Sequence, residues 1–119
     1  MKFLIVDDNR EMRNVIRTIL AGPAHDFTEC PNGSLALEQY RLSRPDCVLM
    51  DVVMPGIDGL EATRRIKASF PNARIVIVTD HDDTDLRSAA EEAGAEGYVL
   101  KEDLSLLRSL CLTRTGASS

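Results

Sequence analysis

The 119-residue chain is long enough to form one ordinary domain and too short to form two. Its composition, 44% hydrophobic and 28% charged, is that of a globular protein. The net charge is −5 and Lys and Arg are not clustered, so we expect no direct binding of nucleic acid by this domain.

The apolar run near the N-terminus, residues 3–6, is too short for a signal peptide or a membrane span. We therefore expect a cytoplasmic protein with no membrane contact. Cys30, Cys47 and Cys111 are odd in number and scattered, without the spacing of a disulfide framework or a zinc site. They are expected to be buried free thiols.

Strands and helices are predicted to alternate along the whole chain. In chain order they are a strand at 2–6, a helix at 9–20, a strand at 26–30, a helix at 33–41, a strand at 46–50, a helix at 60–70, a strand at 74–78, a helix at 84–93, a strand at 97–100 and a helix at 103–112. Four strands are rich in Val, Ile and Leu with few polar interruptions, as in parallel strands buried on both faces. The second strand is more polar and is placed at an edge.

Five strand–helix repeats predict an α/β fold with helices on both faces of a parallel sheet. Right-handed crossovers favour the flavodoxin-like strand order 2-1-3-4-5. In such sheets the site lies at the carboxyl ends of the strands, beside the first and third. We assign residues 1–112 to this domain, and residues 113–119 to a C-terminal tail or the start of a linker.

Five polar side chains follow or end these strands. Asp7 and Asp8 follow the first strand, Asp51 the third, Thr79 the fourth and Lys101 the fifth. Three adjacent carboxylates repel one another and need a cation, and oxygen ligands suit Mg²⁺. A carboxylate can also act as a nucleophile towards phosphorus. The pattern therefore predicts Mg²⁺-assisted phosphoryl transfer at this edge of the sheet.

The chain resembles the receiver domains of bacterial two-component response regulators. The resemblance rests on FLIVDDN, VLMDVVMPGIDG, VIVTD and GYVLKEDL, in this order, and covers essentially the whole chain. It implies a phosphorylation-dependent switch in a two-component phosphorelay rather than an enzyme. The segment KEDL resembles receivers that are usually joined to a helix-turn-helix output domain, so the resemblance also implies regulation of transcription through a fused domain or a partner.

The resemblance assigns the acceptor and the metal ligands. Asp51 is implied to be the phosphoacceptor, with a histidine kinase or a phosphotransfer protein as donor. The implied Mg²⁺ ligands are Asp8, Asp51 and the backbone carbonyl of Val53, and Asp7 assists through water.

The resemblance also assigns the groups that respond to the phosphoryl group. Thr79 and Lys101 are implied to bind the phosphoryl oxygens, and Tyr98 is implied to be the switch aromatic that changes rotamer with Thr79. A homodimer or target surface is implied on the fourth helix, the fifth strand and the fifth helix.

Three residues are candidate modulators of the site. Asp80 stands where the family usually has a small residue, and a fourth carboxylate there predicts slow phosphorylation or a need for a specific kinase. Val53 has an apolar side chain that cannot orient a water, which predicts a phosphorylated state of moderate to long life. His81 is more simply a loop residue, with a contact to the phosphoryl group or its attacking water as the alternative.

Simpler roles exist for each residue taken alone: Asp8 and Asn9 can cap a helix, and Lys101 can be a solvated lysine. Two other functions are weighed against the switch. A pseudo-receiver that signals without phosphate is kept open by Asp80. A small phosphatase with an Asp nucleophile would need an Asp-x-Asp after the first strand and a covering cap, and neither is present.

Overall fold

Strands and helices alternate in the computed structural model, which describes residues 1–112. The strands are β1 (Lys2–Val6), β2 (Asp26–Cys30), β3 (Cys47–Met50), β4 (Ile75–Thr79) and β5 (Gly97–Leu100). The helices are α1 (Arg10–Leu20), the 3₁₀ turn η1 (Gly33–Leu35), α2 (Ala36–Ser43), α3 (Gly59–Ser69), α4 (Thr84–Ala93) and α5 (Leu107–Leu112). No helix within residues 1–112 is long and apolar enough to cross a membrane.

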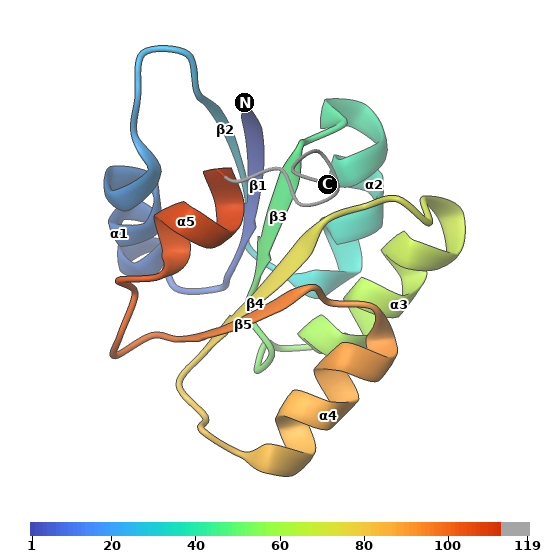
Figure 1. The fold of residues 1–119 in the computed structure, drawn as a ribbon. Coiled ribbons are helices and arrows are strands. Elements are labelled where there is room, and N and C mark those ends of the chain that lie inside the picture. The colour runs from blue at the N-terminus through green and yellow to red at the C-terminus, as the bar shows by residue number, and fades with distance from the viewer. Residues whose placement is uncertain (113–119) are drawn as a thin grey trace, which may run out of the picture.

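All five strands form one parallel sheet in the order β2-β1-β3-β4-β5, which confirms the predicted topology (Figure 1). The register pairs Val6 with Cys30 on one side and with Met50 on the other. Every residue of β3 and β4 is buried. The polar strand β2 lies at an edge, as predicted. Because of this position most of its side chains are only partly buried.

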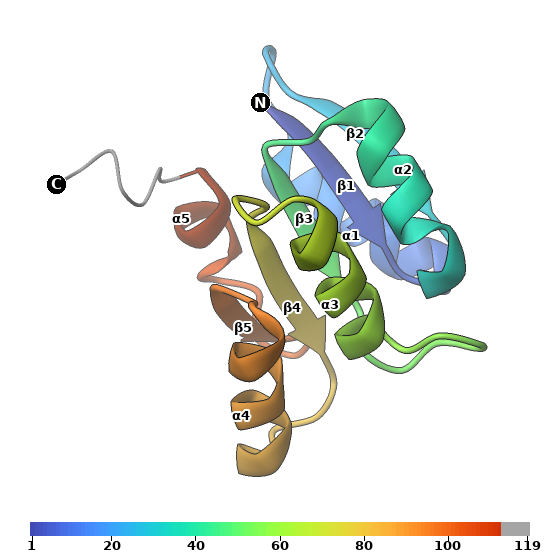
Figure 2. The same cartoon turned by 90° about the vertical axis from the view of Figure 1, so that its right-hand side faces the viewer.

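The side chains of the central strands alternate between two apolar clusters. One cluster joins residues such as Leu4 and Val48 to helices α2, α3 and α4. The other joins their strand neighbours, such as Ile5 and Leu49, to α1 and α5. Figures 1 and 2 show the same division, with α1 and α5 on one face of the sheet and the other three helices on the opposite face. The three cysteines are buried free thiols, as predicted.

The last helix begins later than the sequence predicts. We expected a helix from residue 103, but α5 begins at Leu107. The side chain of Asp103 accepts hydrogen bonds from both the backbone N–H and the hydroxyl of Ser105. This local bonding stabilises a turn in place of a first helical turn.

Two smaller differences are found elsewhere. Strand β4 extends to Thr79, one residue beyond the prediction, which places that hydroxyl inside the sheet. The predicted helix at 33–41 is a 3₁₀ turn followed by α2. Before β2, His25 is partly buried, and its ring packs edge-on against Phe3.

Polar side chains cap the three helices that follow the loops of the predicted site. The side chains of Asn9, Asp58 and Asp83 accept hydrogen bonds from the first-turn N–H groups of α1, α3 and α4. Gly94 ends α4 in a left-handed conformation with φ of 106°, which glycine adopts without strain. Asn9 rather than Asp8 caps α1, which leaves the Asp8 carboxylate available to a ligand.

Candidate functional site

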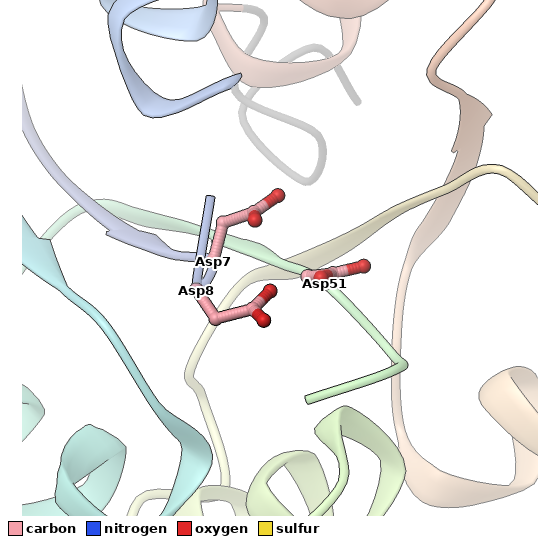
Figure 3. A group of neighbouring side chains, drawn as sticks. All are labelled: Asp7, Asp8 and Asp51. Carbon is pink, nitrogen blue, oxygen red and sulfur yellow. The ribbon is translucent and has the colours of Figure 1, made fainter. Parts of the chain in front are cut away.

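Three carboxylates meet where β1 and β3 end. Asp7, Asp8 and Asp51 each offer an oxygen within 4.8 Å of the others, and Figure 3 shows the three side chains gathered at this end of the sheet. Asp7 and Asp51 are 1% and 5% exposed, whereas Asp8 is open to solvent. Two of the three negative charges are thus removed from water, which is costly without a cation.

Strand pairing and helix packing hold Asp51 in place. Its N–H donates to the carbonyl of Val6 at 2.8 Å, and its Oδ1 accepts from the N–H of Val52 at 2.9 Å. Helix α3 packs so closely on the loop after β3 that a Cβ on Gly59 would lie 1.8 Å from the Asp51 carbonyl oxygen. Only glycine fits at this approach, so the first residue of α3 helps to position the loop.

Lys101 supplies the positive charge between the two buried carboxylates. Its Nζ lies 3.0 Å from Asp7 Oδ2 and 3.3 Å from Asp51 Oδ1. The side chain is 11% exposed, so Lys101 is not the solvated lysine of the simpler interpretation. One ammonium group faces three carboxylates, and the site keeps an excess of negative charge.

Burial and repulsion act together on Asp51. Burial first, and the nearby Asp7 carboxylate second, raise the pKa of Asp51 to about 6, although Lys101 and the Val52 N–H act in the opposite direction. Burial alone lowers the pKa of Lys101, but its contacts with Asp7 and Asp51 outweigh burial and raise it. Lys101 therefore stays charged at neutral pH, whereas the ionised form of Asp51 is destabilised by its surroundings.

An open cavity of about 250 Å³ lies over Asp51. It is lined by Asp8, Asn9, Asp51, Val53, Thr79, Asp80, His81 and Lys101. All the site residues predicted from the strand ends line it except Asp7, which is buried behind Lys101. Val53, the predicted apolar modulator, is 61% exposed and lines the cavity.

The family model for the response regulator receiver domain matches residues 3–110. This chain belongs to that family. Receiver domains of this family are the signalling switches of two-component systems. They accept phosphoryl groups from histidine kinases and bind Mg²⁺ at an acidic pocket.

Curated relatives are response regulators. The chain is 42% identical to the chemotaxis protein CheY of Halobacterium salinarum over 98 residues, which is 82% of each protein. It is 34% identical to response regulator MprA of Mycobacterium avium over 120 residues, which is 97% of this chain and 52% of MprA. The receiver thus spans about half the length of MprA.

Solved structures share the fold closely. The BeF₃-activated N-terminal receiver domain of Klebsiella pneumoniae RstA superposes with a TM-score of 0.85 at 31% identity, covering 94% of this chain and 97% of that one. A LuxR-family two-component response regulator from Aurantimonas sp. SI85-9A1 gives 0.84 at 33% identity, covering 95% and 86%.

The receiver's predicted switch residues are joined through the backbone of His81. The N–H of His81 donates to Thr79 Oγ1 at 3.3 Å, and its carbonyl accepts a hydrogen bond from the Tyr98 hydroxyl. Thr79 itself is fully buried at the end of β4. The imidazole is exposed on the loop after β4, so the backbone of His81, not its ring, links the other two residues.

Sequence reasoning missed Arg13, which supports the receiver's acidic loop. Its Nη1 donates to the backbone carbonyl of Asp7 at 2.6 Å, and its Nε donates to Glu29 at 2.9 Å. The guanidinium thereby ties the loop after β1 to α1 and β2. Its position one turn into α1 gave no signal by itself, because an arginine on an amphipathic helix is ordinarily solvated.

Proposed function

We propose that this receiver accepts a phosphoryl group on Asp51 from a histidine kinase or a phosphotransfer protein, with Mg²⁺ bound beside it. The observation that carries the proposal is the Asp51 carboxylate itself. It is buried, repelled by Asp7, paired with Lys101 and open to a cavity at the carboxyl end of the sheet.

The donor set fits a hard divalent cation. Asp7 Oδ2 is buried and has no hydrogen-bond donor in good geometry, although the Lys101 ammonium is 3.0 Å away. We assign Asp8, Asp51 and the Val53 carbonyl as Mg²⁺ ligands, and Asp7 as a partner through a bound water. When bound, the ion neutralises charge on the phosphoryl oxygens and orients them.

The two oxygens of Asp51 are not equivalent. Oδ1 accepts from the Val52 N–H and faces Lys101, while no hydrogen bond or ion pair within residues 1–112 engages Oδ2. We therefore assign Oδ2 as the nucleophile. A new P–O bond forms at Oδ2 while the bond from phosphorus to the donor's imidazole nitrogen breaks, and the histidine leaves.

Lys101 and Thr79 are proposed to bind the negatively charged phosphoryl oxygens. The Lys101 ammonium already lies 3.3 Å from the acceptor carboxylate and is proposed to bind a phosphoryl oxygen. The Thr79 hydroxyl accepts from His81, so its own proton is free for a second phosphoryl oxygen. Movement of Thr79 would be passed through His81 to Tyr98, the proposed switch, and shift a pre-existing equilibrium between two conformations.

The output surface is proposed to be the α4, β5 and α5 face, acting on a target or forming a homodimer in the cytoplasm. Because the receiver spans about half of MprA, and because LuxR-family regulators share its fold, we propose regulation of transcription through an output domain or a partner. A pseudo-receiver is the second candidate, because Asp80 lines the cavity and adds a further carboxylate to it.

Mass spectrometry of the intact protein tests the proposal. We expect incubation with acetyl phosphate and Mg²⁺ to add one phosphoryl group, ~80 Da. The adduct should vanish with Asp51→Ala or without Mg²⁺. Labelling that persists in Asp51→Ala would remove Asp51 as acceptor. No adduct in either the wild type or Asp80→Ala, even with an active histidine kinase, would leave the pseudo-receiver as the better function.

A further inference from the structure

Arg87 on α4 packs over the ring of Tyr98. Its guanidinium carbon lies 4.4 Å from the ring centroid, which is the geometry of a cation–π contact. Arg87 Nη2 also lies 3.5 Å from Asp82 Oδ1, so the cation is held between the loop before α4 and the ring on β5. No role in the proposed phosphoryl transfer accounts for this contact.

The hydroxyl of the same ring donates to the His81 carbonyl, and the His81 N–H donates to Thr79. Tyr98 therefore makes two contacts of different kinds. Arg87 packs on the face of its ring, and its hydroxyl donates to the loop after β4. Two other arginines lie over aromatic rings, but those rings belong to Phe27 and Phe70, which have no group to bond a loop.

Space exists for another position of the ring. A groove of about 350 Å³ between α4 and β5 is lined by both Arg87 and Tyr98, with the small residues Ala90, Ala95 and Gly97 among its walls. Tyr98 packs against the core but is only partly buried, so the core does not enclose its ring on all sides. A weak contact can therefore change the populations of the Tyr98 rotamers.

We propose that Arg87 is a positioning residue, and that its guanidinium holds the Tyr98 ring in the rotamer that bonds His81. This inference rests on the proposed function, since Tyr98 matters only if Thr79 and Asp51 form the switch. Removing an exposed cation–π contact should lower the ratio of this rotamer to the others by about two- to fivefold. Arg87 would thus set the resting bias of the switch from outside the phosphorylation site.

The test is the χ1 rotamer population of Tyr98 in ¹³C,¹⁵N-labelled protein without any phosphodonor. Three-bond couplings from Cγ to the backbone nitrogen and carbonyl carbon report this torsion and are not altered by loss of a nearby charge. We expect Arg87→Ala and the neutral Arg87→Gln to lower the population ratio alike, and Arg87→Lys to keep most of it. Arg64→Ala is the matched control, because Arg64 is a similarly exposed, ion-paired helical arginine far from Tyr98 in the chain.

Unchanged couplings in Arg87→Ala and Arg87→Gln would overturn the proposal. So would Arg87→Gln matching the wild type while Arg87→Ala does not, or Arg87→Lys matching Arg87→Gln, because the cation would then not be the cause. The mass of the acetyl phosphate adduct is measured on the same samples. An adduct without the Arg87 effect defeats this inference alone. The Arg87 effect defeats the Asp51 proposal alone if neither the wild type nor Asp80→Ala gives an adduct, even with an active histidine kinase.

Discussion

Among the single residues, Asp51 is held in a position that destabilises its own charge. Its pKa of about 6 in the folded protein exceeds the value near 3.9 in an unfolded chain. The folded state therefore binds the extra proton between about pH 4 and pH 6, and the associated stability is lost as the pH rises through that window. The ionised Asp51 carboxylate thus costs stability at neutral pH.

Asp51→Asn should therefore stabilise the metal-free protein. At pH 7.5 in EDTA we expect the free energy of unfolding to rise by about 2–3 kcal/mol. This corresponds to the difference between a pKa of about 6 in the folded protein and about 3.9 in the unfolded chain. The gain should shrink as the pH falls from 6 to 4, because wild-type Asp51 is then neutral too. Urea unfolding across this range measures it. Asp26→Asn, at an exposed aspartate on β2, is the control and should change little, and a gain from Asp51→Asn that does not depend on pH would contradict the explanation.

Asp80 should slow the arrival of anionic phosphodonors. It is exposed at the cavity that already contains Asp8 and Asp51, so its charge is partly screened by water. We expect Asp80→Asn to raise the rate of labelling by acetyl phosphate about three- to tenfold, with the larger effect at low salt. Time courses of intact mass at two salt concentrations measure it. Equal rates for the variant and the wild type would show that Asp80 is not a barrier.

Val53 should lengthen the life of the phosphorylated state. Its exposed apolar side chain lines the cavity and offers no group to orient an attacking water. Val53→Asn supplies an amide there, and we expect the aspartyl phosphate to decay severalfold faster. Decay of the adduct after removal of the donor is the measurement, with the apolar Val53→Ile as the control. If the aspartyl phosphate of the wild type decays rapidly and Val53→Asn does not change the rate, another residue governs hydrolysis.

At the scale of elements, the strands were the most predictable part. Strands β1, β3 and β4 are almost entirely apolar because helices cover both of their faces, and this burial is visible in their composition. The start of α5 was not predictable, because the apolar positions after residue 103 suit a helix. The competing hydrogen bonds, which Ser105 donates to the Asp103 side chain, leave no trace in the apolar pattern from which the helix was predicted.

The junction between β3 and α3 is the tightest approach of two elements at the site. A methyl group on Gly59 would lie 1.8 Å from the Asp51 carbonyl oxygen and 2.9 Å from Val52 Cα, both backbone atoms. We expect Gly59→Ala to lower the free energy of unfolding by more than about 2 kcal/mol, and to lower Mg²⁺ affinity because the Asp51 loop must move. In Gly97→Ala the added Cβ meets only side chains at 3.4 Å or beyond, so this control should change stability far less. Equal unfolding midpoints for the two variants would show that the loop adapts freely.

For the whole molecule, the site follows from the order of the strands. Since parallel strands point the same way, residues at the ends of β1, β3, β4 and β5 must meet at one edge, and they do. Pairing within the site was less predictable. Whether Lys101 contacts Asp7 as well as Asp51, and whether Arg13 reaches the Asp7 carbonyl, depends on side-chain rotamers and burial that no strand pattern specifies.

Because the three carboxylates repel one another in the folded state and separate when the chain unfolds, a cation that binds only the folded site must stabilise the whole molecule. At a free Mg²⁺ concentration ten times its dissociation constant, linkage predicts a gain of about 1.4 kcal/mol. Urea unfolding with MgCl₂, against NaCl of equal ionic strength, measures this gain. Asp8→Asn should abolish most of it while leaving the metal-free protein folded, since Asp8 is exposed and is not the cap of α1. An equal gain in Asp8→Asn would mean that Mg²⁺ acts elsewhere, or by screening alone, and the metal-ligand assignment would then fail even if Asp51 accepts a phosphoryl group.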